Sequence, residues 1–302
     1  RDLRMSRGLG DVYKRQLLGL FSISALTLSV AQASMPKSQV LLADLNTPYG
    51  LQVTIVSDSD SYNNQPHIHN NGVYFTHEVL SIEQSQTDIA YYDFATKQII
   101  NITNTPVSEY SPTVMPNKQS LSAIVVEANG KQKLWQYPLD SEVAASRIFD
   151  WIEPVGYHAW GINNDLVMFI LGEPHTLQYS LVAAAKGQVV AKNIGRTLIY
   201  NHTMAQFIFS YTQNEQHIVA RFNPQTKQVE NLLRLPLQVQ DFILKDDSTL
   251  AYALNNRVYQ RNLSGNNTVS QWLDLTPYCH TNITRMSYNN DKLAFVCDVA
   301  ED

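Results

Sequence analysis

A repeat with a period of 40 to 46 residues restricts the fold of this chain more than any other sequence feature. Each repeat opens with a short strand signal that ends in a turn rich in Asn, Asp, Gly or Lys, residues that tolerate tight-turn conformations. A near-constant period of this length is typical of stacked blade arrays. The six windows of the repeat begin at Tyr62, Ser108, Pro154, Ile194, Leu237 and His280.

The first repeat, residues 62–105, shows the content of one unit. It contains four short segments rich in Val, Ile, Tyr, Phe and Thr, which predict strands at 65–69, 73–80, 87–94 and 98–103. One four-stranded meander cannot bury both of its faces, so several must stack face to face. The sequence therefore predicts an all-β fold, a six-bladed β-propeller.

The sixth repeat is incomplete, because the sequence ends at Asp302 after the second strand of that repeat. Residues 39–45 and 51–56, near the other end, read as two strands with no preceding pair. Joining the two ends leaves no open sheet edge, which is otherwise an aggregation hazard. We expect the last blade to be closed by the N-terminal strands, with two strands from each end.

The residues before these strands carry two other signals. Residues 1–16 resemble a translated adapter sequence and are interpreted as non-native. An apolar stretch over 17–30, flanked by Lys14-Arg15 and by Ala31-Gln32-Ala33, predicts a cleaved signal peptide at 17–33. We therefore expect a propeller over residues 34–302 that is periplasmic or secreted, without a membrane span.

The charge of the chain limits the classes of partner that it can bind. The formal net charge is −5 and no cluster of Lys and Arg is present, which argues against nucleic acid. We expect a monomer that binds a protein, peptide or glycan.

Export permits a disulfide between Cys279 and Cys297, but the hairpin register places Cys297 opposite about Thr284, so two buried thiols remain an alternative.

The turn after each first strand, such as Ser-Pro-Thr-Val-Met-Pro-Asn-Lys at 111–118, resembles the WD40-like (PD40) repeat of TolB-type six-bladed propellers. The resemblance covers residues 39–302, and the fourth repeat departs most from it, at Tyr200-Asn201-His202-Thr203. The segments SEYSPTVMP, KQKLWQYPLD, PVGYHAW and LGEPHTLQ resemble a secreted bacterial TolB-like group without an established activity. The resemblance implies the fold and leaves the function open.

Propeller geometry assigns the loops to two faces. Loops between blades, and loops between second and third strands, share one face, and this face is the richer in His, Glu and aromatic residues. Loops on a rigid scaffold commonly carry binding groups. We therefore predict a ligand pocket on the inter-blade-loop face, formed by Glu109, Tyr110, Glu127, Tyr157, His158, Trp160, Glu173 and His175.

Two alternatives remain open for this cluster. His158 and His175 with Glu173 or Glu127 have the ligand types of a divalent metal site, which would suit a hydrolase or lyase. Otherwise, the same residues tie loops together. No GxSxG, GxGxxG or P-loop motif is present, so a binding module is the main prediction and catalytic residues are unknown.

Four residues on first strands are expected near the axis. His67 and His69 alternate on one strand, so both can face the channel. Asp241 and Arg285 lie on the first strands of adjacent blades, where an ion pair is an open prediction.

Overall fold

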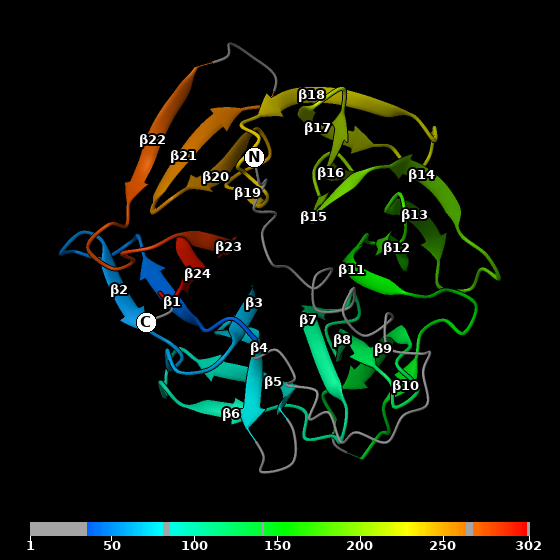
Figure 1. The fold of residues 1–302 in the computed structure, drawn as a ribbon, viewed down its shortest axis with the longest axis horizontal. Coiled ribbons are helices and arrows are strands. Elements are labelled where there is room, and N and C mark those ends of the chain that lie inside the picture. Colours follow the sequence, from blue (N-terminus) through cyan, green and yellow to red (C-terminus); the bar gives the residue numbers. More distant parts are fainter. Residues whose placement is uncertain (1–34, 81–84, 141, 264–267, 301–302) are drawn as a thin grey trace, which may run out of the picture.

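The computed structural model describes residues 35–80, 85–140, 142–263 and 268–300. The predicted adapter segment and signal peptide lie outside these residues. The described residues form 24 strands in six four-stranded antiparallel sheets, which are arranged as blades around one axis (Figure 1). No helix in these ranges is long and apolar enough to cross a membrane.

Five blades are continuous in sequence, and the predicted repeats match them. Blade 1 contains β3 (Asn63–His69), β4 (Gly72–Leu80), β5 (Ser85–Asp93) and β6 (Ile99–Asn101). Blade 2 contains β7 (Ser108–Val114), β8 (Ser120–Val126), β9 (Gln132–Pro138) and β10 (Ser146–Arg147). Blade 3 contains β11 (Val155–Trp160), β12 (Asp165–Ile170), β13 (Thr176–Leu181) and β14 (Gln188–Lys192).

The remaining blades complete the ring. Blade 4 contains β15 (Ile194–Asn201), β16 (Gln206–Gln213), β17 (Gln216–Phe222) and β18 (Val229–Leu235). Blade 5 contains β19 (Phe242–Leu244), β20 (Thr249–Leu254), β21 (Arg257–Asn262) and β22 (Val269–Asp274). Blade 6 contains β23 (Ile283–Asn289), β24 (Lys292–Asp298), β1 (Ser38–Asp44) and β2 (Gln52–Ile55).

Blade 6 joins the two ends of the propeller. Its strand order is β2-β1-β24-β23, so two strands come from each end, which confirms the predicted closure. β1 pairs with β24 along its full length, from Ser38 opposite Asp298 to Asp44 opposite Lys292. Figure 1 shows β1 and β2, coloured blue, beside β23 and β24, coloured red.

The two faces of β1 show why an alternating apolar strand suits this position. Val40 and Leu42 pack in a cluster with Val73 and Phe75 of blade 1. Leu41 and Ala43 point the other way, into a cluster that contains Ile243 and Ala251 of blade 5. Successive side chains of a strand point to opposite faces. Each closing strand therefore fills two inter-blade cores at once.

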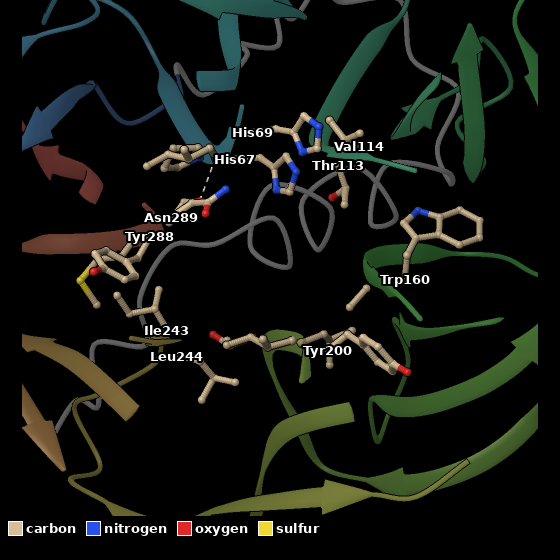
Figure 2. A pocket seen from close by; sticks show the side chains of 18 of the residues that line it. His67, His69, Thr113, Val114, Trp160, Tyr200, Ile243, Leu244, Tyr288 and Asn289 are labelled. Carbon is tan, nitrogen blue, oxygen red and sulfur yellow. Dashed lines mark hydrogen bonds between the residues drawn. The ribbon is translucent and has the colours of Figure 1, made fainter. Parts of the chain in front are cut away.

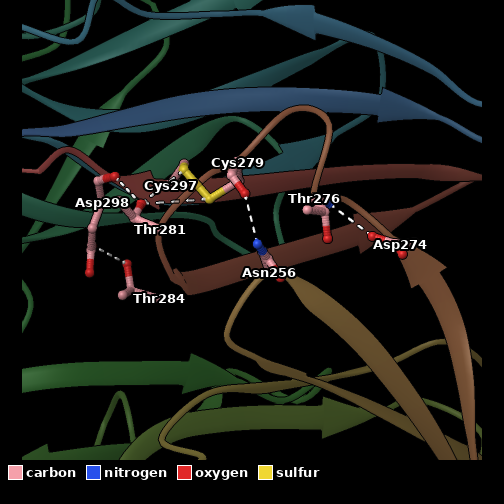
Figure 3. The surroundings of a disulfide bond; sticks show 8 residues. All are labelled: Asn256, Asp274, Thr276, Cys279, Thr281, Thr284, Cys297 and Asp298. Atoms are coloured by element: carbon pink, nitrogen blue, oxygen red, sulfur yellow. Dashed lines mark hydrogen bonds between the residues drawn. A yellow bond between two sulfur atoms is a disulfide. The ribbon is translucent and has the colours of Figure 1, made fainter.

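A disulfide between Cys279 and Cys297 ties the segment before β23 to β24 (Figure 3). Cys297 lies opposite Ile283, close to the register predicted from the hairpin. The segment before β23 does not continue as a strand, and the two Cα atoms lie 5.7 Å apart, within bridging range. The disulfide is the alternative that the structure supports.

We expect Leu41→Ala to lower the free energy of unfolding by about 2–5 kcal/mol, because it leaves a cavity in the core between blades 5 and 6. Ile55→Ala, on the exposed outer strand of the same blade, is the control and should change the free energy by less than about 0.5 kcal/mol. Urea unfolding measures both. Equal effects of the two variants would contradict the proposed role of β1 in closure.

Candidate functional site

The six inner strands, β3, β7, β11, β15, β19 and β23, enclose an axial cavity of about 1180 Å³. Side chains from all six blades line it, and Figure 2 shows His67, Thr113, Trp160, Tyr200 and Tyr288 around its centre. The predicted channel positions of His67 and His69 are confirmed, because both line the cavity with parallel rings 6.3 Å apart.

The cavity opens on the hairpin-turn face, where first strands turn into second strands. Its lining includes residues of these turns, such as Lys118, Ile162, His202, Asp247 and Asn290. This cavity does not open on the inter-blade-loop face, where the ligand pocket is predicted, although Tyr157, His158 and Trp160 of that prediction line it. Asn and Asp suit the backbone geometry of these turns, and the turns also form the rim of the cavity.

The floor of the cavity is formed by one residue from each blade, which lies in the inner strand or, for Asp241, directly before it. In every blade this residue is the first along the chain that lines the cavity, so it lies farthest from the open face. We call this layer the floor, and its residues are Gln65, Ser111, Tyr157, Arg196, Asp241 and Arg285.

Arg285 is buried in the floor and contacts two other blades, blade 3 across the axis and blade 5 beside it. Its guanidinium donates a hydrogen bond to Tyr157 Oη at 2.7 Å, and its carbon lies 4.8 Å from the centre of the Tyr157 ring. Its Nη1 lies 3.9 Å from Asp241 Oδ1, which confirms the predicted ion pair. Asp241 also accepts hydrogen bonds from Thr197 Oγ1 at 2.5 Å and from the Met286 amide at 2.8 Å.

Arg196 is the second guanidinium of the floor. It donates one hydrogen bond from Nη2 to the Thr284 carbonyl, whereas its buried Nε has no acceptor among the described residues. Burial, and then the neighbouring Arg285, lower the pKa of Arg196 to about 10, so it remains charged at neutral pH. The floor therefore holds two guanidinium groups and one carboxylate.

The imidazoles of His67 and His158, which line the cavity beside the floor, carry no charge at neutral pH. Burial, and then the neighbouring His69, lower the pKa of His67 to about 4. Burial, and then His67, lower the pKa of His158 to about 3. They therefore contribute polar surface without adding to the positive charge of the floor.

His158 and Trp160 meet at Ser122 of blade 2. Ser122 Oγ lies 2.6 Å from His158 Nε2 and accepts a hydrogen bond from Trp160 Nε1 at 2.8 Å. Ser122 is fully buried and does not line the cavity, so it cannot reach a ligand as a nucleophile. This contact joins blades 2 and 3, while His158 and Trp160 also form part of the cavity wall.

The structure does not bring His158, Glu173 and His175 together. The Phe169 ring contacts both Tyr157 and His175, with centroid distances of 5.5 and 4.8 Å. Neighbouring residues of a strand point to opposite faces, so His158 lies on the face of blade 3 opposite to Tyr157. Glu173 is exposed in the turn before β13. Within the described ranges, no group of three or more His, Cys, Asp or Glu side chains is placed to hold a metal ion.

The remaining residues of the predicted pocket lie outside the cavity lining. Tyr110 is buried and its hydroxyl lies 3.9 Å from Met35 Sδ. Glu127 accepts hydrogen bonds from Trp135 Nε1 at 3.0 Å and from Arg147 Nη2 at 2.8 Å, within blade 2. These contacts favour the alternative in which Glu127 ties parts of blade 2 together and does not contact a ligand.

Glu109 belongs to a buried polar cluster between blades 1 and 2. It is fully buried and accepts hydrogen bonds from Tyr137 Oη at 3.1 Å and Thr103 Oγ1 at 3.3 Å. Burial, with a further contribution from the Asp88 carboxyl, raises the pKa of Glu109 to about 8. A protonated Glu109 can donate to Asp88, whose Oδ1 has no other partner among the described residues.

Glu109 predicts a pH dependence of stability. Its pKa is higher in the folded protein than in the unfolded chain, so its contribution is fully present below about pH 4.5 and is lost as the pH rises through about 8. We expect Glu109→Gln, which cannot ionise, to lose less stability than the wild type between pH 5.5 and 8.5. Urea midpoints at these two pH values measure this difference.

Glu142→Gln, at an exposed turn of blade 2, is the matched control for Glu109→Gln and should keep the wild-type pH dependence. If all three proteins respond equally to pH, Glu109 does not titrate as described. This test concerns blade packing and is independent of any ligand.

The geometry is that of a six-bladed β-propeller with an axial cavity. Comparisons with known proteins show which propellers have a similar fold. No protein family model and no curated protein matches the chain. A putative TolB from Agrobacterium tumefaciens matches with a TM-score of 0.69 and 11% identity, over 89% of this chain and 100% of that chain. The chain therefore has a TolB-like six-bladed propeller fold.

Two further solved structures show how widely this fold is used. TolB from Acinetobacter baumannii matches with a TM-score of 0.56 and 13% identity, over 88% of this chain and 65% of that chain. Oligogalacturonate lyase from Vibrio parahaemolyticus matches with a TM-score of 0.50 and 9% identity, over 89% and 99%. At such identities the likeness concerns the fold alone, and function must come from the site.

Proposed function

We propose that the protein is a binding module whose ligand, a segment of a protein, peptide or glycan, enters the axial cavity from the hairpin-turn face. The observation that carries this proposal is the cavity of about 1180 Å³, lined by all six inner strands. Pockets for small molecules span about 300–1,000 Å³, so the size of this cavity favours an extended segment. A monomer suffices, because one chain supplies the whole lining.

The chemistry of the lining supports binding of a polar chain. Aromatic rings of Tyr157, Trp160 and Tyr288 offer apolar surface, while His67, Arg196 and Asp241 offer hydrogen-bonding groups. Apolar walls with a few convergent polar groups are the usual composition of ligand sites.

The alternative is a metal-dependent hydrolase or lyase. The Vibrio parahaemolyticus enzyme shows that a lyase can use this fold, but that likeness does not extend to the site. The described residues give this alternative no specific support, because His158, Glu173 and His175 do not converge. The geometry therefore favours a binder.

Export to the periplasm or the medium is part of the proposal. The supporting observation is the disulfide between Cys279 and Cys297, since disulfides form and persist in oxidising compartments.

A cavity-filling substitution tests the proposed binding function. Thr113 lines the cavity (Figure 2), so Thr113→Trp should obstruct entry. We expect ligands selected from random peptide and glycan arrays on the wild type to lose at least ~10-fold in affinity for this variant, about 1.4 kcal/mol. Fluorescence polarisation with the selected ligands measures the loss.

Thr54→Trp makes the same chemical change on the exposed outer strand of blade 6 and is the control. It should leave the affinity unchanged. Ligands that bind wild type, Thr113→Trp and Thr54→Trp equally would show that the axial cavity is not the binding site. Conversion of the ligand, dependent on an added divalent metal, would favour the enzyme instead.

A further inference from the structure

The floor of the axial cavity carries more positive than negative charge. Arg196 and Arg285 face one carboxylate, Asp241, which is already engaged with Arg285, Thr197 and Met286. A buried charge is costly unless it is paired and hydrogen-bonded. One guanidinium of the floor therefore lacks a carboxylate at ion-pair distance among the described residues.

Arg196 is the guanidinium that lacks one. Within the described residues no carboxylate lies within 4.0 Å of it, and its single hydrogen bond to a protein acceptor goes to the Thr284 carbonyl. Asp241 and Asp298 interact with Arg196 electrostatically at longer range. Asp298 accepts a hydrogen bond from Thr284 Oγ1 at 3.0 Å and does not line the cavity. An acceptor for Arg196 can therefore come from a ligand that reaches the floor.

Two described tyrosine rings lie next to the floor and outside the cavity lining, and Gln65 of the floor donates a hydrogen bond to Tyr62 Oη at 3.4 Å. Tyr62 and Tyr110 are buried there, and Met35 packs against the cluster that contains both rings. We infer that these rings limit how far a ligand extends past Arg196, so that a ligand entering from the open face presents a chain end to the floor.

We propose that the floor binds the C-terminal carboxylate of a peptide, held by Arg196 with Arg285 beside it. This inference rests on the proposed binding function and names the ligand of the same cavity. A carboxylate supplies the single negative charge that the floor lacks, and its planar geometry matches a guanidinium. A free C-terminus places this group at the end of every peptide chain, whereas most glycan chain ends are neutral.

The wall above the floor suits the last residues of such a peptide. His67 and His158 are uncharged at neutral pH, so the carboxylate is attracted to the guanidinium groups alone. The ring of Tyr157 in the floor and the ring of Trp160 in the wall line the same cavity and can contact the terminal side chain. Polar and aromatic groups thus surround the space next to the proposed carboxylate.

The experiment compares random peptide libraries that differ only in a free or an amidated C-terminus. We expect wild-type protein to select ligands from the free library, and amidation of a selected peptide to weaken binding at least ~10-fold, because a charge-assisted hydrogen bond is lost. Arg196→Gln should weaken binding of the free peptide by a similar factor. Amidation should then have little further effect on the variant, as expected for two groups in contact.

Arg234→Gln, which removes an exposed arginine outside the cavity, changes the net charge equally and should bind like wild type. Selected peptides that tolerate amidation but are blocked by Thr113→Trp would overturn the carboxylate inference and leave the proposed binding function intact. If neither library yields a ligand sensitive to Thr113→Trp, or only uronic-acid oligosaccharides bind, the peptide C-terminus inference is wrong.

Thermal stability separates a binding role of Arg196 from a structural role. A partly buried guanidinium with no carboxylate at ion-pair distance contributes little to the empty protein, so Arg196→Gln should keep the wild-type Tm or raise it by about 2–4 °C. A Tm lowered by more than ~5 °C, with peptide affinity retained, would identify Arg196 as a structural residue and overturn the inference.

Discussion

Pairing of β1 with β24 is the interaction on which the rest of the structure depends. The seven residue pairs between these strands convert an open array of blades into a ring. Closure by both chain ends completes blade 6, whose edge strand β23 lines the axial cavity with the first strands of the other five blades. A contact between the chain ends therefore supports the wall of the site.

The same ring explains why charged groups collect on the axis. Six inner strands converge there, and side chains from different blades meet although they are far apart in sequence, as Arg285 and Tyr157 do. Arg196 and Arg285 are held in this layer by contacts to blades other than their own. The floor is therefore a property of the closed ring, and no single blade contains it.

The sequence predicted most of the fold, because each blade is a local unit. The strands of blade 1 agree with the prediction to within about two residues, and the incomplete sixth repeat pointed to the closure by β1 and β2. These features depend on alternation and turn chemistry, which are visible within one repeat. The disulfide remained open, because it depends on how the segment before β23 turns back.

The candidate site was less predictable, because it depends on how far each inner-strand side chain lies from the floor of the cavity along the propeller axis. Tyr157 in the floor and His158 and Trp160 in the wall do line the cavity, whereas Glu173 and His175 do not. Strand alternation separates His158 from His175, and the burial of Glu109 follows from contacts between blades. Arg196 becomes apparent only when the six inner strands are aligned by their position relative to the floor.

The register of β1 and β24 also determines where the chain leaves the ring. Ser38 lies opposite Asp298, so both ends of the closing ladder emerge side by side, at the end of β24 remote from its hairpin turn and hence on the face opposite the cavity mouth. Tension applied between these two residues would load the hydrogen bonds one after another, as in a zipper, and would not shear them together. A tether attached at either end would leave the cavity mouth unobstructed. Mechanical force on such a tether would act first on the pairing of β1 with β24, which closes the ring.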